Sequence, residues 1–175
     1  VRDALVAGIT LNIFNNHSDR VRIANIAQAV NVLQSPVLTE GDRMILTPTW
    51  YVFSMYMAHQ DAVLLRSSVA CDRVGTDSDI VNSVTTSASR RDGVYTVTLT
   101  NADLDDSRDI TVEFAGMTGK ISSVEAYALT GEKMNSMNTF AEPDNVRTEK
   151  TSSGISSTAA VSVSVPAKSV VQLTV

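Results

Sequence analysis

The chain has 175 residues, a formal net charge of −5 and 43% hydrophobic residues, a composition that supports a packed core and excludes a disordered chain. The acidic balance excludes nucleic acid as a partner, because phosphate backbones are bound by basic surfaces. Runs of about 20 apolar residues, which a membrane-spanning helix needs, are absent from the sequence. Cys71 is the only cysteine, so neither an intramolecular disulfide nor a cysteine metal cluster can form.

The first third of the chain has an α/β pattern. Over residues 3–15 the apolar positions recur at helical spacing, which predicts a helix with Leu5, Ile9 and Ile13 in its buried stripe. Residues 23–33 are almost uncharged and rich in β-branched side chains. This composition predicts a strand buried on both faces of a parallel sheet, with a short buried helix as the open alternative.

A second helix is predicted after this segment. Thr47 has the right chemistry for an N-cap, and Pro48 suits the first helical position because proline lacks an N–H. We expect Trp50, Phe53 and Met57 to form the buried stripe of this helix, with Tyr56 as a further candidate. Helix, buried strand and helix in this order are typical of an α/β domain.

After residue 60 the hydrophobic period changes to two. Over residues 94–101 apolar residues alternate with threonines, the pattern of a strand with two different faces. Residues 134–154 carry few apolar side chains and are predicted to form a long surface connection. Several short strands separated by turns predict a mainly β fold, an antiparallel, jelly-roll-like β-sandwich. The predicted strands are Val63–Cys71, Ile80–Ser89, Val94–Asn101, Ile110–Phe114, Ser122–Leu129, Ala159–Val165 and Ser169–Val175.

Several strings in the first 65 residues resemble glycoside hydrolase family 51, which contains the retaining α-L-arabinofuranosidases. They are RDALVAG (2–8), NNHSDRV (15–21), ANIAQAVNVL (24–33), LTPTWYVF (46–53) and MYMAHQ (55–60). Together the strings are specific, whereas each alone would be weak. Beyond residue 65 the similarity is low but compatible with the family.

The resemblance implies that residues 1–60 are the last helix-strand-helix unit of a (β/α)₈ catalytic barrel and that residues 61–175 are the C-terminal sandwich domain. The acid/base and nucleophile glutamates of the family lie on earlier barrel strands, so no catalytic residue is expected in this chain. Glu40 matches neither glutamate motif. We therefore expect the isolated chain to be inactive. Residues 1–60, without the rest of a barrel, should be covered by another chain or repack onto the sandwich without native strand pairing.

The resemblance also assigns one substrate-binding residue. Gln28 matches the family glutamine that hydrogen-bonds the arabinofuranose, and a neutral amide can both donate to and accept from sugar hydroxyls. Asn25 and Asn31 flank it, but strand alternation would send neighbouring side chains to opposite faces, so Gln28 is the favoured ligand. From the residue pattern alone, a hydrogen-bonded polar residue inside a strand is the favoured interpretation of Gln28, and the resemblance reverses that preference.

The remaining polar and aromatic residues are interpreted as structural. His17 and His59 lack a carboxylate partner in a recognised motif and any cluster at ligand spacing, so no metal site is expected. The spacing of Trp50, Tyr51 and Tyr56 does not make one flat surface for a sugar. The acidic run Asp103–Asp106 lacks the glycine and distal glutamate of a calcium loop and is predicted to be a turn.

The hypothesis that follows is the C-terminal part of a retaining α-L-arabinofuranosidase, a glycoside hydrolase that releases terminal L-arabinofuranose. Its expected partners are arabinose-containing oligosaccharides or polysaccharides, and the parent protein is expected to be a homo-oligomer. No cofactor, nucleic acid or membrane is expected. The alternative is a non-catalytic carbohydrate-binding or structural β-sandwich module. The sequence leaves the cellular compartment and the preferred linkage open.

Overall fold

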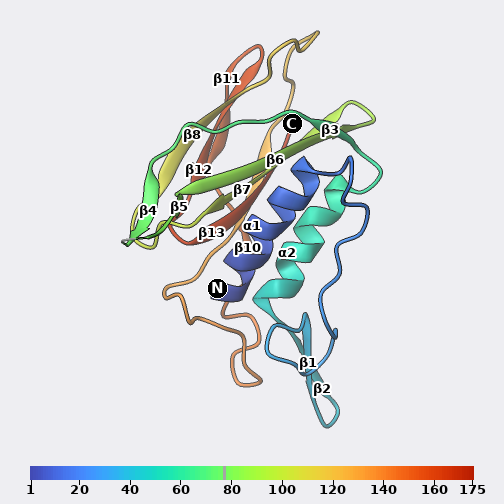
Figure 1. The fold of residues 1–175 in the computed structure, drawn as a ribbon, viewed down its shortest axis with the longest axis vertical. Helices are drawn as coiled ribbons and strands as arrows, with labels where there is room; N and C mark the ends of the chain where they lie inside the picture. The colour runs from blue at the N-terminus through green and yellow to red at the C-terminus, as the bar shows by residue number, and fades with distance from the viewer. Residues whose placement is uncertain (77) are drawn as a thin grey trace.

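The computed structural model describes residues 1–76 and 78–175. Two antiparallel sheets form a sandwich, and two helices lie side by side over the outer face of the larger sheet (Figure 1). None of the helices among the described residues is long and apolar enough to cross a membrane.

Three helical segments and thirteen strands make up the described part of the chain. The helical segments are α1 (Arg2–Asn16), α2 (Pro48–Tyr56) and the 3₁₀ turn η1 (Met57–His59). The strands of the first half are β1 (Val37–Glu40), β2 (Arg43–Leu46), β3 (Val63–Leu65), β4 (Arg73–Thr76), β5 (Asp79–Asn82) and β6 (Val84–Arg91). Those of the second half are β7 (Val94–Asn101), β8 (Arg108–Glu113), β9 (Glu125–Leu129), β10 (Thr148–Lys150), β11 (Ser153–Ser157), β12 (Ala160–Val165) and β13 (Ser169–Thr174).

The larger sheet has six strands in the order β10-β9-β13-β7-β6-β3, and the smaller has three in the order β11-β12-β8. The pairings within both sheets are antiparallel, as predicted for residues 63–175. β6 and β7 form a hairpin with Asp92 and Gly93 as its two loop residues, and both have positive φ, +52° and +88°. This is the geometry of a type I′ turn, whose twist matches that of paired strands.

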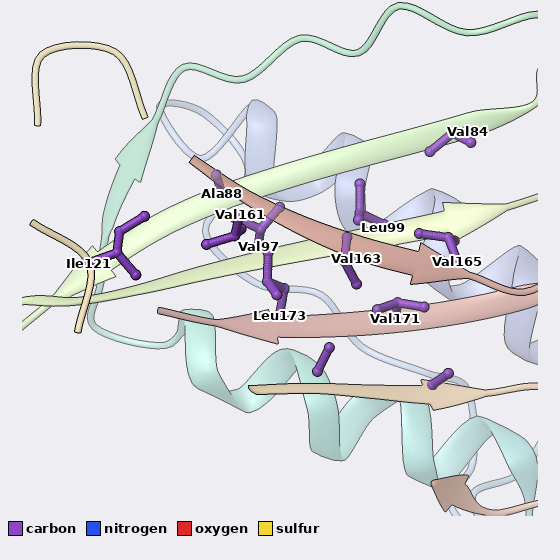
Figure 2. Close-up of a cluster of buried hydrophobic side chains, with 12 residues drawn as sticks. Val84, Ala88, Val97, Leu99, Ile121, Val161, Val163, Val165, Val171 and Leu173 are labelled. Carbon is purple, nitrogen blue, oxygen red and sulfur yellow. The ribbon is translucent and has the colours of Figure 1, made fainter. Parts of the chain in front are cut away.

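The main core lies between the two sheets. Val97 and Leu99 on β7 and Val171 and Leu173 on β13 point toward the smaller sheet, where Val163 on β12 meets them (Figure 2). Each of these side chains is nearly or fully buried. Burying apolar surface at about 25 cal/mol per Å² makes this layer the main source of stability.

The helices pack on the opposite face of the six-stranded sheet. Leu5 on α1 and Val52 on α2 form a second apolar cluster with Leu129 on β9 and Val170 on β13. Residues 1–60 thus share a packed interface with the sandwich. The division into two domains near residue 60 stays a prediction.

The predicted strand over residues 23–33 is not formed. The segment is irregular and has one isolated parallel bridge, between Val30 and Val37, and Ile23 and Leu33 are 75% and 98% exposed. A strand buried on both faces needs neighbours on each side, and the described residues supply no parallel strand that could pair along this segment. The helix-strand-helix order is therefore replaced by helix, irregular segment, hairpin and helix. The helices pack onto the sandwich. The expectation that residues 1–60 repack in the isolated chain stays a prediction.

The two helices form where predicted, but their buried stripes begin one residue earlier. On α2 the buried residues include Thr49, Val52 and Tyr56, and the predicted stripe residue Met57 is 59% exposed. On α1 the small and polar side chains at i, i+4 and i+8 face the sheet. They are Ala4, Gly8 and Asn12, while the predicted stripe residue Ile13 is half exposed.

The strand predictions hold best in the centre of the large sheet. The prediction for residues 94–101 coincides with β7, whereas Val63–Cys71 shortens to β3 and Ile80–Ser89 divides between β5 and β6. Five other short strands were not predicted: β1, β2, β4, β10 and β11. The last two lie within or next to the predicted surface connection over residues 134–154, which is therefore wrong at its C-terminal end.

Candidate functional site

Gln28, the predicted sugar ligand, lies on the irregular segment that joins α1 to the β1–β2 hairpin. Its side chain is exposed, and none of the side-chain hydrogen bonds of the described residues involves it. Its φ is +49°, a left-handed conformation that is uncommon for a glutamine. Such conformations concentrate at functional sites, where the surrounding structure imposes them. Gln28 is thus available to a ligand rather than used in the core.

The backbone around Gln28 is held by the first strand of the hairpin. Val37 N–H donates to the carbonyl of Ala29 at 3.1 Å, and Asn31 N–H donates to the carbonyl of Val37 at 3.1 Å. This is the hydrogen-bond pattern of a parallel pair, limited here to one bridge. The hairpin itself is tied to the start of α2, because Thr47 Oγ1 donates to the carbonyl of Ser35 at 2.7 Å.

The other amides of the segment have different surroundings. Asn31 is hydrogen-bonded to Thr39 on β1, so its side chain is already occupied. Asn25 lines a groove of about 430 Å³ between α1, residues 21–25 and α2, whose wall includes Phe14 and Met57. Gln28 is not part of that groove. The structure therefore separates the three amides rather than gathering them into one site.

The two histidines take structural positions, as expected. His17 is the C-cap residue of α1, where its backbone N–H donates to the carbonyl of Phe14. His59, at the end of η1, is partly buried against the sheet, with Nδ1 2.7 Å from Ser89 Oγ and Nε2 3.1 Å from Thr98 Oγ1. Burial lowers the pKa of His59 to about 4, because desolvation disfavours the charged ring. His59 is therefore a neutral bridge at neutral pH.

A buried polar cluster around Asn12 was not predicted. Asn12 Oδ1 lies 2.7 Å from Tyr56 OH, 2.9 Å from Ser87 Oγ and 2.8 Å from Thr98 Oγ1. Asn12 Nδ2 donates to Thr85 Oγ1 at 3.1 Å. The burial raises the pKa of the Tyr56 hydroxyl, which stays protonated. The alternating threonines of β7 were a signal for this cluster, since a buried polar row on a sheet requires polar partners.

The acidic run is a turn, as predicted. Asp103 accepts the backbone N–H groups of Asp105 and Asp106 at 3.1 and 3.0 Å and the Arg108 guanidinium at 2.7 Å. These backbone hydrogen bonds, with a smaller contribution from Arg108, lower the pKa of Asp103. The carboxylate is thereby satisfied within the turn. Over residues 1–76 and 78–175, no group of three or more His, Cys, Asp or Glu residues could hold a metal ion.

Glu40 occupies the end of β1, next to the hairpin turn. It pairs with Arg43 across that turn, and both side chains are more than half exposed. A retaining glycosidase needs two carboxylates about 5 Å apart on either side of the scissile bond. An exposed glutamate already paired with an arginine does not fit that role, in agreement with the sequence-based interpretation of Glu40.

The fold is that of a mainly β protein, an antiparallel β-sandwich with two helices packed on the outer face of its larger sheet. The alpha-L-arabinofuranosidase C-terminal domain family matches residues 1–169 of this chain. The chain belongs to that family.

Individual relatives agree with this assignment. The chain is 39% identical over 175 residues to an intracellular exo-alpha-L-arabinofuranosidase of Bacteroides ovatus, covering 99% of this chain and 34% of that protein. A probable alpha-L-arabinofuranosidase C of Aspergillus clavatus is 29% identical over 161 residues, 87% of this chain and 31% of that protein. The chain thus spans about a third of the length of these relatives.

Solved structures share the same fold. The GH51 arabinofuranosidase from Xanthomonas axonopodis pv. citri superposes with a TM-score of 0.91 at 38% identity, over 98% of this chain and 34% of that one. The arabinose complex of the Thermotoga maritima enzyme has a TM-score of 0.82 at 22% identity, over 98% of this chain and 37% of that one. At that lower identity the second likeness concerns the fold alone. Both matches include the helices as well as the sandwich.

Proposed function

We propose that this chain is the C-terminal part of a retaining α-L-arabinofuranosidase that releases terminal L-arabinofuranose from arabinose-containing plant polysaccharides and oligosaccharides. The family match over residues 1–169 carries this proposal. The relative lengths support it, because about two thirds of the curated relatives lie outside the region of similarity. In this proposal the acid/base and nucleophile glutamates belong to that other part. The alternative of an independent binding or structural module is less favoured, since the named relatives are arabinofuranosidases.

Within the full-length protein, Gln28 is proposed to hydrogen-bond the arabinofuranose. Its exposure and its left-handed backbone conformation support this role. The sandwich is proposed to brace the catalytic part and to contribute to contacts between subunits of a homo-oligomer. No cofactor enters the mechanism, because acid/base and nucleophilic carboxylates suffice for retaining hydrolysis.

The test compares the full-length protein with this chain alone on an aryl α-L-arabinofuranoside. The full-length protein should hydrolyse it, and proton NMR of the first-formed arabinose should show retained anomeric configuration. The isolated chain should show no turnover, because it lacks the pair of carboxylates that a retaining mechanism requires. Turnover by the isolated chain, purified away from any full-length enzyme, would overturn the proposal. So would a full-length protein without arabinofuranosidase activity.

The role of Gln28 needs a separate variant. In the full-length protein, Gln28→Ala should lower kcat/KM by roughly 10- to 1000-fold, which corresponds to losing about 1.5–4 kcal/mol of hydrogen bonding to the sugar. The thermal midpoint should change little, since the side chain is exposed. An unchanged kcat/KM in a stable variant would remove Gln28 from the site while leaving the proposed activity in place.

A further inference from the structure

The Asn31 side chain accepts a hydrogen bond that a longer parallel strand pairing would give to the Asn31 backbone carbonyl. In a parallel ladder the bonds from Val37 N–H to Ala29 O and from Asn31 N–H to Val37 O would be followed by one from Thr39 N–H to the backbone carbonyl of residue 31. Here Thr39 N–H instead donates to Asn31 Oδ1 at 2.7 Å. The side-chain oxygen thus takes the place of the backbone carbonyl.

The nitrogen of the Asn31 amide makes a second hydrogen bond to the same residue, Thr39. Asn31 Nδ2 donates to Thr39 Oγ1 at 2.9 Å, so the amide and Thr39 exchange two hydrogen bonds. The φ of Asn31 is +57°, which turns the backbone away from β1. Asparagine is one of the few residues with a side chain that tolerates this conformation. Its side chain also carries a donor and an acceptor, both of which this contact uses.

The hairpin that receives Asn31 is itself anchored to the sandwich. Asn138, a buried residue in the connection between β9 and β10, donates from Nδ2 to the carbonyl of Leu46 on β2 at 2.8 Å. Asn138 Oδ1 accepts the N–H of Val146 at 2.7 Å, which fixes the orientation of the amide. β2 pairs with β1 along its whole length, including Met44 opposite Thr39. A continuous hydrogen-bonded path therefore leads from the sandwich to Asn31.

We infer that Asn31 and Thr39 form a positioning pair that sets the placement of Gln28 against the sugar. The inference rests on the proposed function, in which Gln28 contacts the arabinofuranose. Gln28 is three residues from Asn31. The hydrogen-bonded backbone group next to it in the chain is the Ala29 carbonyl, which accepts the N–H of Val37. Without the pair, the segment would keep its bridge between Val30 and Val37 and the hydrogen bonds between Val32 and Ser35. In this account Asn31 acts on Gln28 rather than on the substrate, because its amide oxygen and nitrogen are both hydrogen-bonded to Thr39.

In this arrangement the β1–β2 hairpin and the sandwich affect the reaction by fixing the position of Gln28. A displacement of about 1 Å of a substrate-positioning group can cost roughly 100-fold in rate, even when the altered residue is remote from the chemistry. Loosening the pair should therefore act on kcat/KM much more than on stability, since Asn31 and Thr39 are both exposed.

The test uses the full-length protein and a double-mutant cycle on an aryl α-L-arabinofuranoside. Asn31→Gly deletes the amide and keeps a residue that accepts φ of +57°, and it should lower kcat/KM by roughly 10- to 100-fold. In the Gln28→Ala background, Asn31→Gly should cause little further loss, because a residue that acts only through Gln28 has nothing left to position. A merely structural role would give independent, additive losses.

Two Thr39 variants test the pair even if Asn31→Gly does not fold. Thr39→Val keeps the shape and the backbone N–H but removes the hydroxyl acceptor, so a smaller loss of roughly 3- to 10-fold is expected. Thr39→Ser keeps the hydroxyl and should retain nearly full activity. The matched control is Asn145→Ala, which deletes another exposed asparagine that donates across eight residues, to the Met137 carbonyl at 3.0 Å. It should leave kcat/KM unchanged.

The outcomes separate the two proposals. An active full-length protein that loses activity with Gln28→Ala but not with Asn31→Gly or Thr39→Val would overturn the positioning pair alone. Additive losses in the cycle would also overturn it. A full-length protein that is inactive, or indifferent to Gln28→Ala, would overturn the role of Gln28 in the proposed function, and the positioning pair with it.

Discussion

Asn12 is the residue that fastens α1 to the sheet. It is 1% exposed and lies at the centre of hydroxyls from α2, β6 and β7. Its amide supplies both the acceptor and the donor that these hydroxyls need. An apolar side chain there would remove one hydrogen bond from each of several buried hydroxyls, and a lost hydrogen bond costs about 0.5–1.5 kcal/mol.

We expect Asn12→Ala to lower the free energy of unfolding of the isolated chain by about 2–4 kcal/mol, because it removes hydrogen bonds from several buried partners at once. Urea unfolding followed by circular dichroism measures this change. Asn16→Ala is the matched control on the same helix. Its exposed amide donates once, to the Thr86 carbonyl at 2.8 Å, and its loss should cost less than about 1 kcal/mol. Equal losses of unfolding free energy in the two variants would show that the buried cluster contributes no more to stability than one exposed hydrogen bond.

His59 makes the stability of the fold depend on pH. Its folded-state pKa of about 4 lies below the ordinary value of 6.5, so the unfolded chain binds the proton more tightly. Stability is therefore full above about pH 6.5, falls as the pH drops through the interval to about 4, and is not further reduced by this residue below that. A difference of this size corresponds to about 3 kcal/mol.

The measurement is the free energy of unfolding of the isolated chain between pH 4 and 7, compared with His59→Gln. Glutamine can still hydrogen-bond Ser89 and Thr98 but does not titrate, so the variant should lose the part of the pH dependence that belongs to His59. The carboxylates titrate similarly in both proteins, so they cancel in the difference. Parallel pH profiles for the two proteins would contradict the assignment.

Gly8 allows α1 to approach the sheet closely. A Cβ at this position would lie 2.6 Å from Thr100 Oγ1 on β7 and 2.9 Å from Val170 Cγ2 on β13. Helix propensity favours alanine over glycine by about 1 kcal/mol, whereas overpacking costs about 1–3 kcal/mol. The clash should win, because Val170 is fully buried and has no free space to move into.

Gly8→Ala should therefore destabilise the chain by up to about 2 kcal/mol, which is the overpacking cost less the gain in propensity. Thermal unfolding detects the change as a lower midpoint. Val6→Ala, on the exposed side of the same helix, is the comparison and should change the midpoint little. A higher midpoint for Gly8→Ala would mean that α1 shifts away from the sheet at no cost.

Among the elements, strands are predicted best where the residues on the two faces differ in polarity. β7 was predicted with correct bounds because apolar residues and threonines alternate over its whole length. The β1–β2 hairpin was missed although Gly41 and Asp42, between two short apolar runs, are a two-residue turn signal. Strands as short as β10 have too few residues for a period to be recognised.

The predicted helix stripes are only partly correct, because Leu5 is buried whereas Ile13 and Met57 are exposed. The sheet face under α1 carries buried Ser87, Thr98 and Thr100, so the helix presents glycine and asparagine to it instead of isoleucine. An amphipathic pattern predicts only which side chains avoid water, and it cannot predict a polar interface inside the protein. The sequence likewise suggested Gln28 through the resemblance, but not the hydrogen bonds of Asn31. That pairing joins two segments through an irregular turn with no periodic signal.

For the molecule as a whole, β7 and the segment 23–33 have opposite surroundings. β7 is paired along its length with β6 on one side and with β13 on the other, between two packed clusters. Residues 23–33 have a single bridge and largely exposed side chains. Amides in a central strand exchange only through global unfolding, whereas amides without internal bonds exchange by local fluctuation.

Hydrogen exchange on the isolated chain should therefore show strong protection over residues 94–101 and rapid exchange over residues 23–33. The proposed function adds a comparison with the full-length protein. If earlier barrel strands pair with residues 23–33 there, their amides should become protected, while those of 94–101 should change little because their partners lie within this chain. Mass spectrometry of peptides from both proteins, with the monomeric state of the isolated chain established by light scattering, measures the difference. Equally strong protection of both segments in a demonstrated monomer would contradict the structure, and unchanged rapid exchange over 23–33 in the full-length protein would contradict the barrel strand.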